Sequence, residues 1–235
     1  RIYFYETRIN FSWKLQTQIT HSIRSSNNLA GEEQIITGEW GASNTFGSVM
    51  VTGDMNADGR LDVSIGAPAY SSSTGRVYVF FSDTRLTPNS SGADIVITGN
   101  ASGDLFGTSL ASGDFNTDGK GDLAVGAPGY STNTGRAYIF YGDSKVPTTA
   151  ATADITITGN ASGDLFGTAL AAGDVNNSAD TDLIIGAPDY LTLQGRAYVF
   201  YNDGSIPTTA GTADVTITGN ASNDAFGAAL TSKDV

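Results

Sequence analysis

Residues 106–128 read FGTSLASGDFNTDGKGDLAVGAP, and the same arrangement recurs along the chain. The dipeptide Phe-Gly begins at Phe46, Phe106, Phe166 and Phe226, a spacing of 60 residues each time. The tripeptide Gly-Ala-Pro follows at 66–68, 126–128 and 186–188, on the same period. Because a fixed internal period indicates stacked structural units, this repeat decides the fold class.

Each unit contains four short segments with the character of β-strands. In the second unit these are 106–114, the continuous apolar stretch 122–128, the aromatic stretch 135–143 and the alternating stretch 153–159. Pro128 closes the second segment, since proline cannot donate a further ladder hydrogen bond. No segment keeps an apolar period of 3.6 residues, so we expect no long helix. Four strands per unit predict an all-β fold of β-propeller blades, each with four antiparallel strands.

The two ends of the chain carry partial units. Residues 1–5 (RIYFY) are similar to 76–80, the third strand of a unit, which predicts one strand of a preceding blade. We assign residues 1–34 to this strand and an irregular insertion, and 35–235 to the propeller repeats. Three complete blades are expected, with a partial one starting at Phe226. Because closed rings need about four to eight blades, further blades or an oligomer must complete the ring. We also expect that this chain is a processed piece of a longer protein.

Composition excludes several classes of function. The 24 Asp and Glu outnumber the 12 Lys and Arg, so we expect neither nucleic acid nor an anionic membrane as a partner. No cysteine is present, which excludes disulfides, a thiolate zinc site and a catalytic cysteine. The single histidine, His21, lies outside the repeats, which therefore lack a Ser-His-Asp triad. There is also no run of 18 apolar residues for membrane insertion. We expect no enzyme activity.

Three nine-residue loops concentrate acidic side chains: DMNADGRLD (54–62), DFNTDGKGD (114–122) and DVNNSADTD (174–182). Adjacent carboxylates repel one another unless a cation lies among them, and calcium takes several oxygen ligands. Side chains at positions 1, 3 and 5 can converge, a glycine at position 6 permits a sharp turn, and a carbonyl and a carboxylate follow at positions 7 and 9. The predicted calcium ligands are Asp54, Asn56, Asp58, Arg60 and Asp62, and Asp114, Asn116, Asp118, Lys120 and Asp122.

The third loop departs from this pattern. It keeps Asp174, Asn176 and Asp182, but has Ser178 and an alanine where the other loops have Asp and Gly. Asp180 could compensate with its side chain, so we expect a third, weaker calcium site. Position 12 is an apolar strand residue rather than Glu, which excludes an EF-hand. Magnesium fits less well because it requires tight octahedral geometry, and an acidic turn without an ion is the alternative interpretation.

Together, Phe-Gly, D-x-N-x-D-G-x-x-D and Gly-Ala-Pro at this period resemble the FG-GAP repeats of integrin alpha-subunit β-propellers. The resemblance covers residues 35–235. It implies a seven-bladed propeller with calcium in hairpin loops on one face, in secreted or cell-surface proteins. The first two acidic loops match the motif throughout and the third only in part. The absence of cysteine departs from integrins, and the near-identity of GNASGDLFGT in two units favours a recent duplication, as in large microbial surface proteins.

Other repeated residues have structural interpretations beside functional ones. The Phe of each Phe-Gly is expected to pack between blades. The arginines are expected to form a structural ion pair, a carbonyl cap or a ligand-facing ring. The tyrosines two residues after Gly-Ala-Pro fill the space between blades or form a binding rim. These residues are Arg76, Arg136 and Arg196, and Tyr70, Tyr130 and Tyr190. Asn100, Asn160 and Asn220 stand in Asn-Ala-Ser, which is either a glycosylation sequon or a plain turn.

These patterns predict a calcium-binding extracellular or cell-surface module in which calcium is structural. The module would mediate adhesion or bind a protein or glycan ligand at the cell surface. A first alternative is a subunit of a surface layer, sheath or filament that self-associates through blade edges. A second is a non-catalytic propeller attached to an enzyme such as a phospholipase.

Overall fold

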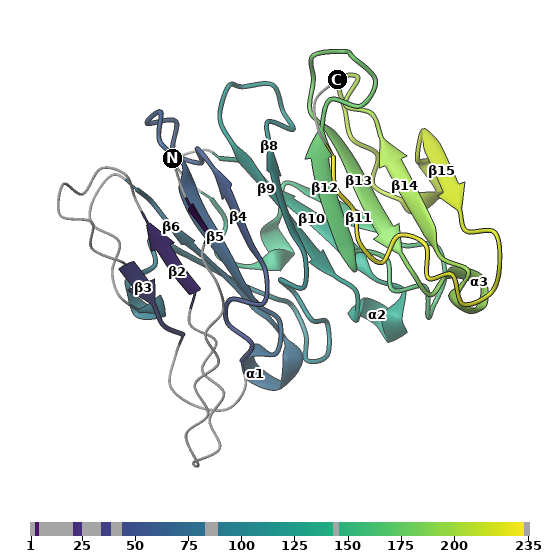
Figure 1. The fold of residues 1–235 in the computed structure, drawn as a ribbon, viewed down its shortest axis with the longest axis horizontal. Coiled ribbons are helices and arrows are strands. Elements are labelled where there is room, and N and C mark those ends of the chain that lie inside the picture. Colours follow the sequence, from purple (N-terminus) through teal and green to yellow (C-terminus); the bar gives the residue numbers. More distant parts are fainter. Residues whose placement is uncertain are drawn as a thin grey trace.

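The computed structural model describes residues 3–4, 21–24, 34–38, 44–82, 89–142 and 146–232. Three antiparallel sheets of four strands follow one another in chain order (Figure 1). Blade one contains β4 (Met50–Gly53), β5 (Asp62–Ala67), β6 (Arg76–Phe80) and β7 (Ile95–Thr98). Blade two contains β8 (Leu110–Gly113), β9 (Asp122–Ala127), β10 (Arg136–Phe140) and β11 (Ile155–Thr158). Blade three contains β12 (Ala169–Gly173), β13 (Asp182–Ala187), β14 (Arg196–Phe200) and β15 (Val215–Thr218). The predicted four strands per unit are confirmed.

The second strand of each blade lies in the middle of its sheet and is almost wholly buried. In β5 and β9 all six residues are buried, which explains their continuous apolar sequence. Each of these strands ends at the alanine before proline, as the missing N–H of proline requires. The Gly-Ala-Pro motif therefore marks the end of the second strand.

Short turns join the second and third strands at one edge of the blades, where Figure 1 shows α1 (Tyr70–Ser73), α2 (Tyr130–Asn133) and α3 (Tyr190–Leu193). Three successive residues of each turn have positive φ, such as Ser131, Thr132 and Asn133 at 48°, 55° and 63°. Single 3-10 turns, η1 (Ser90–Gly92), η2 (Ala150–Thr152) and η3 (Ala210–Thr212), precede each fourth strand. No helix of the described residues exceeds four residues or could cross a membrane.

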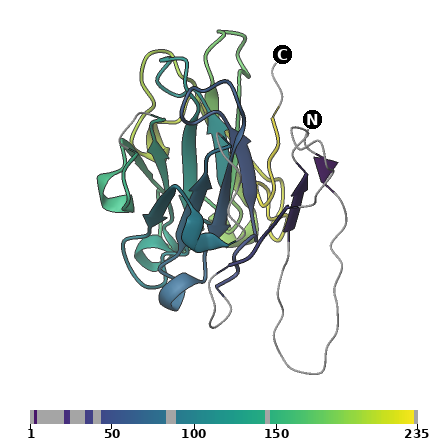
Figure 2. The same ribbon diagram turned by 90° about the vertical axis from the view of Figure 1, so that its left-hand side faces the viewer.

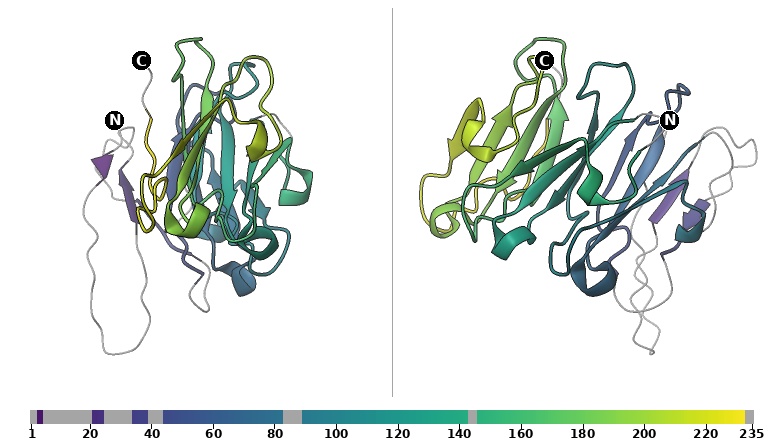
Figure 3. Two further views of the ribbon diagram at one scale, coloured as in Figure 1. Left: turned by 90° about the vertical axis from the view of Figure 1, so that its right-hand side faces the viewer. Right: turned by 180° about the vertical axis from the view of Figure 1, so that it is seen from behind.

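The blades pack face to face, and the core lies between them (Figure 3). Phe106 and Phe166 are completely buried, each in a cluster that joins side chains of two successive blades. The Phe106 ring meets Tyr138 edge to face, with 5.5 Å between ring centroids. The main chain of Phe106 also pairs with Gly75 of the preceding blade. Phe106 and Phe166 are therefore wedges between blades, as expected.

A separate three-stranded sheet contains β1 (Tyr3–Phe4), β2 (His21–Arg24) and β3 (Gln34–Ile36) (Figure 2). Ile36 packs against blade one. In blade one the third strand lies directly beside the fourth. In the sheet of β1, β2 and β3, the strand beside β3 is β2. His21–Arg24 rather than Tyr3–Phe4 therefore occupies the place of a third strand. The insertion itself supplies this strand. Because the inserted residues have no counterpart 60 residues along the chain, the repeat pattern does not reveal it. The remainder of the insertion lies outside the described residues.

Candidate metal-binding loops

Each acidic loop joins the first and second strands of a blade, at the edge opposite the short helices (Figure 1). The loops lie between β4 and β5, β8 and β9, and β12 and β13. Because successive blades repeat the same meander, the three loops follow one another along one edge of the stack. The structure thus places all the sequence-predicted ligands on one side of the molecule.

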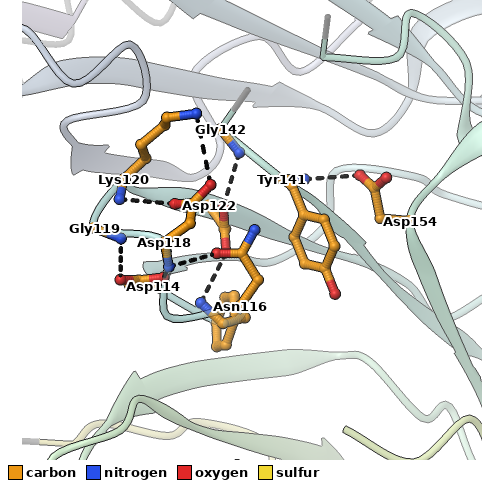
Figure 4. A network of polar contacts seen from close by, with 10 residues as sticks. Asp114, Asn116, Asp118, Gly119, Lys120, Asp122, Tyr141, Gly142 and Asp154 are labelled. Atoms are coloured by element: carbon orange, nitrogen blue, oxygen red, sulfur yellow. Dashed lines mark hydrogen bonds and ion pairs between the residues drawn. The ribbon is translucent and has the colours of Figure 1, made fainter. Parts of the chain in front are cut away.

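In the second loop the expected ligand side chains turn inward (Figure 4). The backbone N–H of Asp118 donates to Asp114 Oδ1 at 3.1 Å and to Asn116 Oδ1 at 3.0 Å. The N–H groups of Gly119 and Lys120 donate to Asp114 Oδ2 and Asp118 Oδ1, at 2.8 and 2.9 Å. Two oxygens that share one donor must lie close together, so positions 1 and 3 converge.

The first loop repeats this geometry. The Asp58 N–H donates to both Asp54 Oδ1 and Asn56 Oδ1, each at 3.0 Å. Gly59 and Arg60 donate to Asp54 Oδ2 and Asp58 Oδ1, at 2.8 Å in both cases. Two loops that share only part of their sequence therefore adopt one hydrogen-bonded arrangement.

The ninth residue of each loop has a different environment. Asp62, Asp122 and Asp182 are completely buried. The carboxylate of Asp122 accepts the N–H of Phe115 at 2.8 Å and that of Gly142, beyond the third strand, at 2.7 Å. Sequence analysis assigned these residues only to the metal, whereas each also ties its loop to the chain after the third strand.

Burial raises the pKa of Asp122 to about 6, although the N–H donors of Gly142 and Phe115 act in the opposite direction. The charges of Asp114 and Asp118 also raise the pKa of Asp122, which places these three carboxylates near one another. Burial likewise raises the pKa of Asp62. A cation beside these groups would favour their ionised forms.

The elevated pKa of Asp122 predicts that the free energy of unfolding depends on pH when a chelator keeps the loops free of metal. An unfolded Asp ionises near pH 4, whereas folded Asp122 keeps its proton up to about pH 6. The unfolded state therefore binds fewer protons in this window, and the contribution of Asp122 to the free energy of unfolding falls as pH rises from about 4 to 6. Carboxyl ¹³C NMR, assigned with Asp122→Asn, should show a midpoint near pH 6. A midpoint near pH 4 would contradict the burial argument.

The third loop keeps the backbone arrangement with fewer carboxylates. The N–H of Ser178 donates to Asp174 Oδ1 and Asn176 Oδ1, at 3.0 and 2.9 Å, and the N–H of Ala179 donates to Asp174 Oδ2 at 2.8 Å. Ala179 has a φ of 76°, in the left-handed region that glycine occupies in the other loops. Asp180 is one of the residues that line a cavity between blades two and three. The expected compensation by Asp180 stays a prediction.

Among the described residues, no three His, Cys, Asp or Glu side chains gather closely enough to form a metal site by themselves. The expected ligand set is mixed, because it includes an Asn amide oxygen and a backbone carbonyl at position 7 of each loop. Calcium accepts both kinds of oxygen. The donor chemistry of the first two loops therefore fits calcium, and a calcium site there would need the Asn and the carbonyl in addition to the carboxylates.

The repeated arginines and tyrosines, for which separate roles were predicted, pair with each other in the structure. The guanidinium of Arg76 lies 3.6 Å from the centroid of the Tyr70 ring, and Arg136 lies equally close to Tyr130. Arg196 lies 3.7 Å from the centroid of the Tyr190 ring. Such a cation–π contact stabilises the turn between the second and third strands. The constant spacing of six residues between each tyrosine and the following arginine could have indicated this pairing.

The fold and the loops define the class of protein: the described repeats are blades of a β-propeller with an acidic hairpin loop in each. The family model for the FG-GAP repeat matches residues 46–80, 106–140 and 166–200. The chain belongs to the FG-GAP β-propeller proteins.

Two kinds of relative support this assignment. Phosphatidylinositol-glycan-specific phospholipase D of Bos taurus is 35% identical over 159 residues, covering 61% of this chain and 18% of the relative. Integrin alpha-PS2 of Drosophila melanogaster is 35% identical over 169 residues, covering 68% and 12%. Human integrin alpha-IIb is 35% identical over 164 residues, covering 65% and 15%. The chain thus spans less than a fifth of the length of these relatives.

Proposed function

We propose that this chain is a calcium-binding β-propeller module of an extracellular or cell-surface protein, and that it acts by binding rather than by catalysis. The observation that carries the proposal is the shared N–H donor of positions 1 and 3, which brings two ligand oxygens together in each loop. Local hydrogen bonds hold these oxygens in place before an ion arrives.

In the second loop, Asp114, Asn116 and Asp118 would bind calcium through their side chains and Lys120 through its carbonyl. Asp122 would add a carboxylate that also accepts two backbone N–H groups. The matching residues of the first loop would do the same. The third loop would bind more weakly, because Ser178 replaces one carboxylate. Calcium would stabilise the blades, since Asp122 also holds the chain after the third strand.

The names of the relatives support a binding role at the cell surface. Integrin alpha subunits are among them, and their similarity extends over 65–68% of this chain. We infer a protein or glycan ligand for this chain. A second candidate is a non-catalytic propeller within a larger enzyme, which the phospholipase D relatives favour. A catalytic domain encoded in the same gene would support the second candidate.

Thermal unfolding in chelator, in calcium and in magnesium tests the proposal. At about 100 times the dissociation constant, each occupied site adds about 2.7 kcal/mol. In a chain of this size, each kcal/mol corresponds to about 2–4 °C. We therefore expect the midpoint to rise by several degrees in calcium and by less in magnesium.

Matched variants locate the effect. Asp54→Asn and Asp114→Asn should each remove part of the calcium-induced rise, and Asp174→Asn should remove less. Asp203→Asn is the control, because it removes the same charge from an exposed position outside the loops. An equal midpoint in chelator and calcium would contradict the proposal and leave the loops as acidic turns.

A further inference from the structure

A cavity of about 390 Å³ opens between blades two and three, at the edge that carries the acidic loops. One wall is the second acidic loop with Tyr141, whose ring lies beside Asn116 (Figure 4). The other wall contains Asp180 of the third loop and the connection after β14, from Asn202 to Ile206. Its volume lies within the range of small-molecule sites, about 300–1,000 Å³.

The groups that shape this cavity are particular to the junction between blades two and three. The residue that corresponds to Asp180 in blade two is Lys120, whose ammonium lies 3.6 Å from Asp118 Oδ2. The residue that corresponds to Asn202 is Gly142, where a Cβ atom would lie 2.1 Å from the carbonyl oxygen of Gly121. The junction between blades one and two therefore has no carboxylate at the position of Asp180 and no room for an amide at the position of Asn202. The departures of the third unit from the repeat pattern coincide with the cavity.

Asn202 supplies an acceptor of fixed orientation. The residue is 3% exposed, and its Nδ2 donates to the carbonyl of Phe115 at 3.1 Å. Because this bond fixes which way the amide faces, Oδ1 remains to accept a hydrogen bond. The backbone N–H of Asn202 donates to Asp182, so the residue is held at both ends. A polar group held this rigidly is suited to selecting a ligand by its donors.

The chemistry of the lining indicates the class of ligand. Thr117 and Ser205 add hydroxyl groups, and Tyr141 and Ile206 add an aromatic and an apolar surface. The lining contains one carboxylate, Asp180, and neither Lys nor Arg. An anionic ligand would therefore meet a like charge without a counter-charge. Neutral hydrogen-bonding groups beside an aromatic face suit a pyranose ring, which has hydroxyl groups around its edge and C–H groups on its faces.

We propose that this cavity binds a neutral sugar residue at the end of a glycan, with Asp180 and Asn202 accepting hydrogen bonds from its hydroxyl groups and Tyr141 packing against its ring. This inference deepens the proposed binding function and rests on it. A site that hydrogen-bonds hydroxyl groups discriminates strongly against ligands that lack them, because its own buried polar groups would then stay unpaired.

Saturation-transfer NMR on the calcium-loaded chain tests the proposal. The probes are methyl mannoside, methyl galactoside, L-fucose and N-acetylglucosamine, with N-acetylneuraminic acid and n-butylamine as charged comparisons. At least one neutral sugar should bind, and Asp180→Ala should weaken it roughly tenfold or more, as expected for a hydrogen bond to a charged group. Asp94→Ala removes the same charge from an exposed position in blade one, away from the cavity, and should leave sugar binding unchanged.

The calcium-dependent midpoint of each variant is measured in parallel, so that the two proposals are separated. Loss of sugar binding by Asp180→Ala with a retained calcium shift supports the cavity site. Absence of sugar binding, sugar binding unaffected by Asp180→Ala, or a preference for the anionic sugar or the amine overturns it. In each of these cases the calcium shift still decides the proposed function, and sugar binding without a calcium shift would overturn the calcium proposal alone.

Discussion

Replacing Phe166 with alanine is expected to lower the free energy of unfolding by about 3–5 kcal/mol, the range observed for buried aromatic residues. Phe166 is completely buried, and its ring meets Tyr198 at 5.4 Å between centroids. It packs in one cluster with Ile139 of blade two and Ile185 of blade three. Removal of the ring leaves a cavity at a junction where both blades are rigid sheets, so little collapse can fill it. Urea unfolding in saturating calcium measures the loss.

Phe226 provides a control at the same position of the motif. Its side chain is 38% exposed, so Phe226→Ala should cost clearly less than Phe166→Ala. Because the two residues share sequence context, the difference between the variants measures burial between blades rather than any intrinsic property of the motif. Equal losses would contradict the interpretation of Phe166 as a wedge.

Gly135→Ala is expected to be the second strongly destabilising change. Gly135 has a φ of 81°, and a Cβ atom there would lie 2.0 Å from the carbonyl oxygen of Phe166 in the next blade. The left-handed conformation costs about 1–2 kcal/mol for a residue with a Cβ. Overpacking adds about 1–3 kcal/mol. The same urea experiment should therefore show a loss of about 2–5 kcal/mol.

Gly163→Ala separates these two contributions. Gly163 has a φ of 91°, yet a Cβ atom there would meet nothing within 4 Å. This variant should show only the conformational cost of about 1–2 kcal/mol. If both variants lost the same stability, the close approach of the blades at Gly135 would contribute nothing, and the stacking of Phe-Gly against the preceding blade would need another explanation.

Most of the fold could be predicted from the sequence because its determinants are local and repeated. The alternation at 153–159, the apolar stretch before Pro128 and the absence of a helical period predict strands, and the structure has them. The strand His21–Arg24 was not predicted, since it lies in an insertion without a copy elsewhere in the chain. The period that reveals the blades carries no information about residues inserted once.

The geometry of the acidic loops was predictable in part. The convergence of Asp114 and Asn116 arises within nine residues, through N–H donors of the same loop. The second role of Asp122 was not predictable, because its partner Gly142 lies beyond the third strand. The pairing of Arg136 with Tyr130 could have been found from their constant spacing.

The repeat, the strands and the loop geometry follow from the amino-acid order alone, because they depend on backbone preferences and hydrogen bonds among neighbours in the chain. Tertiary structure decided which carboxylates are buried and where a cavity forms. Asn202 reaches the carbonyl of Phe115 across 87 residues of sequence, and Asp180 faces the same space from another loop. Such contacts follow from how two sheets pack against each other, and packing depends on the shapes of both surfaces rather than on either segment alone.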